Sequence, residues 1–238
     1  MLKVKIAGIP IGINNRYRHV ERLCRDYLTD EEPLFTVSAT DEEIEKENKI
    51  SDGAYSPGYL ESVVIFRNIA EQIPRYDAVV LHGAVLNKDG KAYAFTAKSG
   101  VGKTTHTRLW LSAFGERAHY LNGDKPIIRF IDGVPYACGT PWQGKEDYGT
   151  NEMLPLRSIA FLDRGIENRA FDISLRDAVT RMVSQVYLPK EKPSNTLLAM
   201  SLLDKLVRSV RLVRLECNMD IEAALVAMNA MTGEFNEE

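Results

Sequence analysis

Apolar and polar residues alternate in a strand-like pattern at the start of the chain. Positions 2–13 alternate well enough to predict a strand, and residues 33–39 predict a second one. Between them, residues 16–27 carry Leu23 and Tyr27 four positions apart, the spacing of one helix face, which favours a short helix.

The next segment is first strongly charged and then amphipathic. Residues 41–49 mix acidic and basic side chains, which is typical of a solvated helix or loop. Residues 60–73 place apolar side chains at helical spacing, and Pro74 is expected to end that helix. We therefore predict a small α+β extension over residues 1–75.

The middle of the chain predicts a β-hairpin followed by a loop and a helix. Residues 78–86 form an apolar run that predicts a strand, residues 87–90 (Asn-Lys-Asp-Gly) signal a turn, and residues 91–96 predict the returning strand. A glycine-rich segment follows, and residues 104–114 have a helix-like pattern.

A second hairpin is predicted after this helix and a short strand at 119–122. Asp132-Gly133, a strong two-residue turn signal, separates apolar runs at 125–131 and 134–138. A doubly wound nucleotide-binding fold would place parallel strands and crossover helices here. The sequence therefore predicts an α/β fold with a mixed, largely antiparallel sheet.

The C-terminal part continues this pattern after a long polar loop at 139–151. Its predicted elements are a strand, two helices, a strand and a closing helix, at 156–162, 175–186, 196–207, 212–215 and 221–231. We assign residues 76–238 to one nucleotide-binding domain.

Composition narrows the classes of partner. With a net charge of −3 among 238 residues, the chain lacks a basic field for nucleic acid or an anionic membrane. It has no apolar run near the roughly 18 residues that span a bilayer. Three widely spaced cysteines predict neither a disulfide framework nor a zinc site. We expect a cytoplasmic protein whose cysteines are buried and inert.

The glycine-rich segment resembles a phosphate-binding loop. Residues 97–104 (AKSGVGKT) follow the pattern G-x-x-x-x-G-K-[ST], with Ala97 at the first glycine position. Backbone N–H groups there are expected to bind phosphate, with Lys103 at the β- and γ-phosphates and the Thr104 hydroxyl on Mg²⁺. The predicted nucleotide-binding residues are Ser99, Gly100, Val101, Gly102, Lys103, Thr104 and Thr105. ATP and Mg²⁺ are the expected cofactors.

The residues around this loop resemble a known family. Residues 81–86 (LHGAVL), the turn, the strand and the loop are similar to the catalytic domain of HPr serine kinase/phosphorylase. The Gly-Lys-Thr-Thr ending is also similar to ATP-type phosphoenolpyruvate carboxykinase, which shares that fold. The resemblance covers about residues 78–130 and weakens to about 165. It implies a bacterial P-loop kinase, and HPr kinases are hexameric, so a homo-oligomer is an open expectation.

Asp124 is the predicted catalytic and metal-binding carboxylate. It follows the predicted strand at 119–122, where phosphoryl-transfer enzymes place an acid for the metal. The family carries paired aspartates, one implicated in proton transfer and its neighbour in metal binding. Here Gly123 or Lys125 occupies the second position, so Asp124 takes either role, and Lys125 could contact phosphate or acceptor instead.

Further candidates surround this centre in the sequence. The resemblance implies that His82 faces the phosphates, and we predict a catalytic role for it with Lys103 and Asp124. The loop at 139–151 could cover the site and bind the acceptor, and Glu146 or Glu152 could supply a second acid. Candidates for a charge-neutralising arginine are Arg157 and Arg164, and His106 is expected to serve packing or to lie near the nucleotide base.

We predict a Mg-ATP-dependent kinase that phosphorylates a hydroxyl, on Ser or Thr of a protein or peptide or on a small hydroxy compound. The alternative is a catalytically weak nucleotide-binding regulatory or scaffold module, which the missing second aspartate supports. A carboxykinase-type enzyme is disfavoured by chain length, and a nucleotide-gated NTPase by the hairpin context.

Overall fold

The N-terminal part builds a small sheet of its own. The computed structural model describes residues 1–51, 53–98, 100–144 and 146–233. β1 (Leu2–Ile6) pairs antiparallel with β2 (Ile9–Asn14), and β3 (Phe35–Ser38) lies parallel to β2. The single strand predicted over 2–13 is therefore wrong. Ala7 and Gly8 both adopt positive φ and make a two-residue turn within the apolar run.

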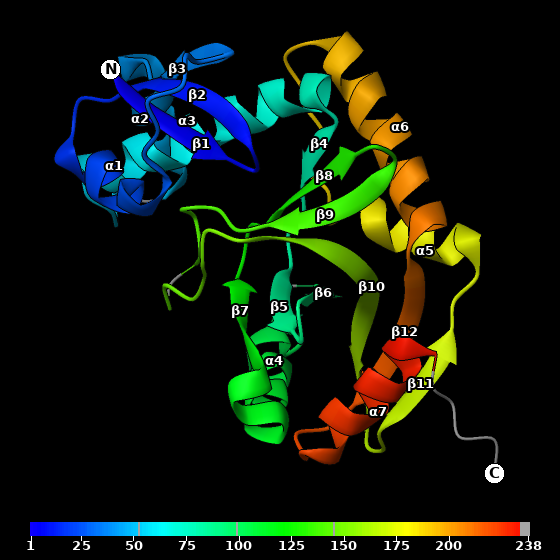
Figure 1. The fold of residues 1–238 in the computed structure, drawn as a ribbon. Coiled ribbons are helices and arrows are strands. Elements are labelled where there is room, and N and C mark those ends of the chain that lie inside the picture. The colour runs from blue at the N-terminus through cyan, green and yellow to red at the C-terminus, as the bar shows by residue number, and fades with distance from the viewer. Residues whose placement is uncertain (52, 99, 145, 234–238) are drawn as a thin grey trace.

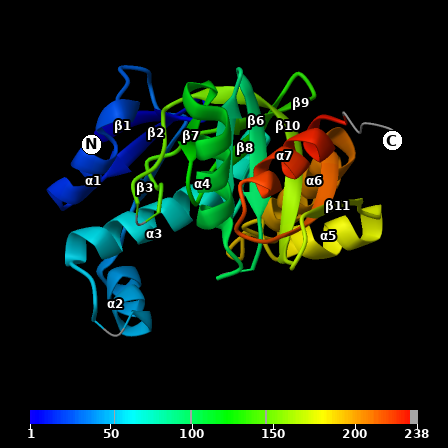
Figure 2. The ribbon, with the colours of Figure 1, turned by 90° about the horizontal axis from the view of Figure 1, so that it is seen from below.

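Three helices accompany this sheet. They are α1 (Arg18–Leu23), α2 (Asp41–Ile50) and α3 (Pro57–Gln72), with short 3₁₀ turns at Arg25–Tyr27 and Ile73–Tyr76. Thr40 and Glu43 form a capping box on α2, which stands away from the rest of the molecule in Figure 2. Ser56 caps α3. The helices predicted within 16–27 and over 60–73 are confirmed, and the charged segment at 41–49, which the sequence left as helix or loop, is helical.

The main sheet follows the order β4-β8-β9-β10-β6-β5-β7, with β12 beside β10 and β11 beside β12. Its strands are β4 (Ala78–Val80), β5 (Ala84–Lys88), β6 (Lys91–Thr96), β7 (Ala118–Asn122), β8 (Ile127–Ile131), β9 (Val134–Cys138), β10 (Met153–Arg164), β11 (Arg169–Asp172) and β12 (Arg211–Cys217). Among the described strands of this main sheet, β10 runs parallel to β6 and β12, and the other ladders are antiparallel. The predicted mixed α/β architecture and both predicted hairpins are confirmed.

The strand predicted over 78–86 is in fact two strands. Between β4 and β5 the backbone bonds to other segments, with His82 N–H donating to Gln185 O at 2.6 Å and Gly83 N–H to Asp124 O at 3.0 Å. A Cβ on Gly83 would lie 2.9 Å from the carbonyl oxygen of Phe95, so this crossing needs glycine. The break exposes His82 at the crossing.

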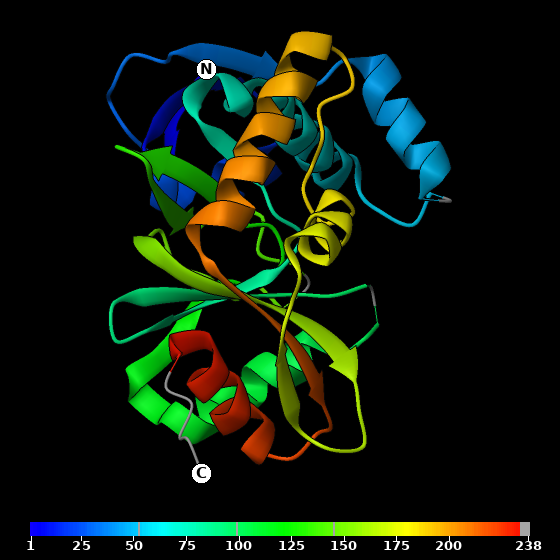
Figure 3. The same cartoon turned by 90° about the vertical axis from the view of Figure 1, so that its right-hand side faces the viewer.

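Helices cover both faces of the sheet. In Figure 3, α5 (Leu175–Val183) and α6 (Pro193–Ser209) lie on one side of the strands, and α4 (Lys103–Phe114) and α7 (Glu222–Thr232) on the other. β10 supplies both layers, because Ile159 and Phe161 pack in the core under α5 and α6 while Ala160 and Leu162 pack in the core under α4 and α7.

The N-terminal part shares a core with the main sheet. Ile6, Ile65 and Ile69 belong to the same buried cluster as Ile127 and Trp142. Figure 1 shows α3 leading from the small sheet directly into β4. Among the described residues, no helix combines the length and apolar character that crossing a bilayer requires.

Candidate functional site

The glycine-rich loop lies between β6 and the first turn of α4. Gly100 has a φ of +79° and Gly102 a φ of +121°, conformations that side-chain-bearing residues rarely adopt. Gly102 is the N-cap of α4, and Lys103 is its first residue. Because the first turn of a helix leaves backbone N–H groups unpaired, this end presents donors and the positive end of the helix dipole.

Lys103 is a half-buried cation whose ammonium donates to the carbonyl oxygen of Ala97 at 3.1 Å. Burial lowers the pKa of Lys103, and the negative charge of Asp124 partly opposes this effect. Among the described residues, no carboxylate lies within ion-pair distance of its ammonium group. The lysine is therefore free to pair with an incoming anion.

The loop opens into a cavity of about 650 Å³. Its walls come from the glycine loop and α4, from the turn at 123–125, from the loop at 141–148, and from α1 and α3. In Figure 1, the loop that follows β9 passes between α1 and the region of α4 and β7. The cavity is thus bounded by both the N-terminal part and the main sheet.

Asp124 lines this cavity between two basic groups. Its carboxylate lies 3.6 Å from His82 Nε2 and 3.5 Å from Lys125 Nζ. Buried Asn122 fixes the turn, since its side-chain oxygen accepts from the backbone N–H of Asp124 at 2.9 Å and of Lys125 at 2.7 Å. The geometry leaves the carboxylate and both basic groups directed at the same space.

His82 is partly buried and faces Asp124. Burial lowers its pKa and the charge of Lys103 lowers it further, whereas Asp124 raises it. The net decrease keeps the imidazole neutral at pH 7, so one ring nitrogen can accept a proton. Its 3.6 Å approach to Asp124 is longer than a hydrogen bond.

The donor set in the cavity suits Mg²⁺ with a nucleotide. Thr104 and Asp124 both line the cavity and offer a hydroxyl and a carboxylate. Among the described residues, no three His, Cys, Asp or Glu side chains form a cluster that could hold a metal alone. Mg²⁺ is commonly held by one or two protein oxygens plus substrate phosphates and waters, which these two residues fit.

The structure brings most of the predicted site residues together. His82, Gly100, Gly102, Lys103, Thr104, Thr105 and Asp124 all line the cavity. Val101 belongs to the loop but does not line the cavity, and Ser99 lies outside the described residues.

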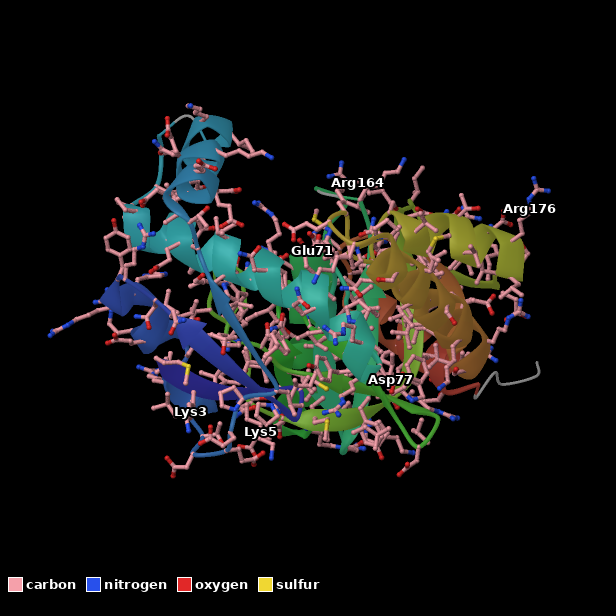
Figure 4. All side chains as sticks on the ribbon, turned by 90° about the horizontal axis from the view of Figure 1, so that it is seen from above. Lys3, Lys5, Glu71, Asp77, Arg164 and Arg176 are labelled. Atoms are coloured by element: carbon pink, nitrogen blue, oxygen red, sulfur yellow. The ribbon has the colours of Figure 1, made fainter. Side chains whose placement is uncertain are left out.

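The secondary candidates divide between the site and the surface. Glu146 lines the cavity and pairs with Arg108 at 2.6 Å, whereas Glu152 pairs with His119 at 2.7 Å outside it. Arg164 donates to the carbonyl oxygen of Gly100 at 2.6 Å and lies at the edge of the molecule in Figure 4. Arg157 donates to the carbonyl oxygen of Thr232 instead, away from the cavity lining.

Sequence reasoning missed the aromatic residues that line the cavity. Tyr55 and Tyr59 stack at a centroid distance of 4.6 Å, and Tyr120 and Tyr148 stack at 4.7 Å. His19, which carried no predicted role, lies in the same lining. The four-residue spacing of Tyr55 and Tyr59 was the available signal, but such spacing is equally typical of core packing.

The chain has a weak structural likeness to a known protein but no match to a family model or a curated protein. Among solved structures, the chain is similar to the HPr(Ser) kinase/phosphatase from Coxiella burnetii, with 9% sequence identity and a TM-score of 0.36 over 65% of this chain and 95% of that one. At this TM-score the likeness carries no argument about the fold or the site.

Proposed function

We propose that the protein is a phosphotransferase that uses Mg-ATP to phosphorylate a hydroxyl group. The observation that carries this proposal is the position of Asp124. Its carboxylate shares one cavity with the glycine loop, with Lys103 and with Thr104, and lies within 4 Å of His82 and Lys125. A carboxylate, an imidazole and two lysines beside a phosphate-binding loop are the parts that phosphoryl transfer needs.

Separate residues bind the phosphates and the metal. Backbone N–H groups at the start of α4 bind the phosphates, and Lys103 pairs with their charge. Thr104 and Asp124 would hold Mg²⁺, which when bound supplies positive charge beside the transferred group. Lys125 reaches the same space and adds a second cation.

Proton transfer falls to His82 or Asp124. The acceptor oxygen forms a bond to the γ-phosphorus while the bond to the bridging oxygen of ADP breaks. The hydroxyl proton moves to neutral His82 Nε2 or to the Asp124 carboxylate. Burial lowers the pKa of His82, which favours the neutral form that can accept this proton.

A second candidate is a nucleotide-binding module with little turnover. The specific observation in its favour is that Asp124 stands alone in its turn, between Gly123 and Lys125, where the resembling kinases carry two aspartates. In addition, Glu146, the candidate second acid that lines the cavity, is already paired with Arg108.

The test is transfer of label from γ-labelled ATP with Mg²⁺ to a panel of hydroxy amino acids, hydroxyl-bearing peptides and small hydroxy compounds. We expect Lys103→Ala and Asp124→Asn each to lower transfer by about 100-fold or more, the usual cost of losing a group that stabilises transition-state charge. Matched controls are Lys91→Ala and Asp172→Asn, both on exposed strand positions. Tight Mg-ATP binding without transfer or ADP release would instead identify the nucleotide-binding module. Transfer that persists in Lys103→Ala would contradict both the proposed phosphotransferase site and the module.

A further inference from the structure

The N-terminal part closes the cavity opposite the glycine loop. His19 and Leu23, four positions apart on α1, line it together with Tyr55, Tyr59 and Val63, which repeat at the same spacing into α3. Residues at this spacing lie on one helix face, so each helix presents a continuous stripe to the cavity. α1 and α3 pack against each other. The two stripes therefore make one wall.

This wall is fixed to the rest of the site. Trp142 Nε1–H donates to the carbonyl oxygen of Ser62 at 3.0 Å, and the Trp142 ring packs on Phe66 at 4.7 Å. Lys125 Nζ lies 5.6 Å from the centre of the Phe66 ring. The wall, the 141–148 loop and the turn that carries Asp124 thus hold one another in place.

The wall belongs to the same cavity as the reacting groups rather than to a remote edge. Tyr59 lines this cavity together with Lys103 and Asp124. A group resting on Tyr59 would therefore share the cavity with the Asp124 carboxylate.

The wall is mainly aromatic and aliphatic, with polar groups at His19 and the two phenols, and part of it opens to solvent. Tyr55 is 45% exposed and Tyr59 is 39% exposed, although the two rings are stacked at 4.6 Å. Sites for small compounds usually enclose most of the ligand. A wall that extends to the protein surface instead suits one segment of a longer polypeptide. Exposed aromatic rings bind apolar and aromatic side chains with little loss of conformational entropy.

Charge beside the wall adds a second preference. Arg18 and Arg22 precede His19 and Leu23 on α1 and are exposed. Within the described part of the chain neither has an ion pair, in contrast to Arg16 and Arg25, which pair with Asp41 and Asp26. Two unpaired arginines at the edge of a binding wall favour acidic groups in the ligand.

We propose that the face formed by α1 and the start of α3 binds the phosphate acceptor, and that this acceptor is a polypeptide segment with an apolar or aromatic residue beside its Ser or Thr and acidic residues nearby. This rests on the proposed function, because only a phosphotransferase has an acceptor. Tyr59 is the specificity-determining residue, with Tyr55 stacked behind it.

The experiment uses the full chain, Mg-ATP and a library of octapeptides with a central Ser or Thr and randomised flanks. We expect selection of Phe, Tyr, Leu or Ile beside the hydroxyl residue and of Asp or Glu elsewhere. For the best peptide, Tyr59→Ala should raise KM about tenfold while the affinity for Mg-ATP, measured by calorimetry, stays the same. Tyr59→Phe should restore KM, and Arg18→Ala with Arg22→Ala should remove the acidic preference.

Leu197→Ala, at a 69% exposed position on α6, is the control that should change neither KM nor selection. Equal use of all peptides, better use of free hydroxy compounds, or an unchanged KM in Tyr59→Ala would overturn the acceptor assignment. Turnover of Mg-ATP that depends on Lys103 without label on any peptide would overturn it as well, yet leave the phosphotransferase standing. Absence of any turnover that depends on Lys103 would instead refute the proposed function.

Discussion

His106 is a histidine buried beneath the glycine loop on α4. It is 2% exposed, its ring packs against Phe95 at 5.1 Å, and neither ring nitrogen has a hydrogen-bond partner within the described residues. Burial lowers its pKa to about 4. The sequence-based expectation of a packing role for His106 agrees with this position.

This burial predicts a specific loss of stability in acid. The unfolded chain binds a proton near pH 6.5, whereas the folded protein does so only near pH 4, so the stabilisation is complete above pH 6.5 and lost as the pH falls towards 4. The difference amounts to about 3 kcal/mol. Urea unfolding at pH 7, 5.5 and 4.5 should show this slope, and His106→Leu should flatten it. Parallel slopes for the two proteins would contradict the assignment.

Site residues could be predicted where a local pattern dictates the chemistry. The glycine loop is such a pattern, because positive φ at Gly100 and Gly102 and the lysine at the helix start follow from adjacent residues. Asp124 was predicted from its place after the strand at 119–122, and His82 from the resemblance. Tyr55 and Tyr59 could not be foreseen, because their role depends on α3 lying near the glycine loop and the loop at 141–148, which are about 45 and 90 residues away in sequence.

At the scale of elements, α3 connects the two parts of the molecule through buried carboxylates. Glu61 accepts hydrogen bonds from the backbone N–H groups of Arg16 and Tyr17. Glu71 accepts from the Tyr187 hydroxyl at 2.7 Å and from the backbone N–H of Lys190 at 3.0 Å. In Figure 4, Glu71 lies among packed side chains at the inner end of α3.

Removing the Glu71 carboxylate should therefore destabilise the fold. Glu71→Ala removes a buried carboxylate that accepts from the part-buried donors of Tyr187 and Lys190, which we expect to lower the free energy of unfolding by about 3 kcal/mol. Glu71→Gln keeps an acceptor oxygen and should cost less. Glu42→Ala, at an exposed position on α2, should stay within about 0.5 kcal/mol of the wild type in the same denaturant titration. An equally small effect of Glu71→Ala would show that these bonds do not stabilise α3.

Element types followed from sequence more readily than element breaks. Hairpins at Asp89-Gly90 and Asp132-Gly133 were predictable because both residues of each pair adopt the positive φ that such turns require. The break at His82 and Gly83 was not, since the residues there bond to Gln185 and Asp124, which lie far along the chain. The turn at Ala7 and Gly8 was hidden by an apolar run without Asn or Asp.

For the whole molecule, the shared core predicts cooperative unfolding. Residues 1–75 were assigned in the sequence to an extension, a division that stays a prediction. Ile6 and Ile69 nevertheless lie in one buried cluster with Ile127, Cys138 and Trp142. A fragment of residues 76–238 would expose that apolar surface, so we expect it to aggregate or to remain partly unfolded.

Calorimetry of the full chain should show one transition, with fluorescence and far-ultraviolet circular dichroism giving the same midpoint. Two resolved transitions, or a soluble and cooperatively folding 76–238 fragment, would show that the extension is an independent domain.

β10 has a consequence for how this chain can vary among its relatives. Each of its two faces is committed to a different core, and its edges carry β6 on one side and β12 on the other. A single inserted or deleted residue between Ile159 and Leu162 would exchange the two faces and shift both ladders at once. Insertions and deletions should therefore accumulate in the loops before Met153 and after Arg164. β10 itself should keep a constant length, so divergent sequences can be aligned on it.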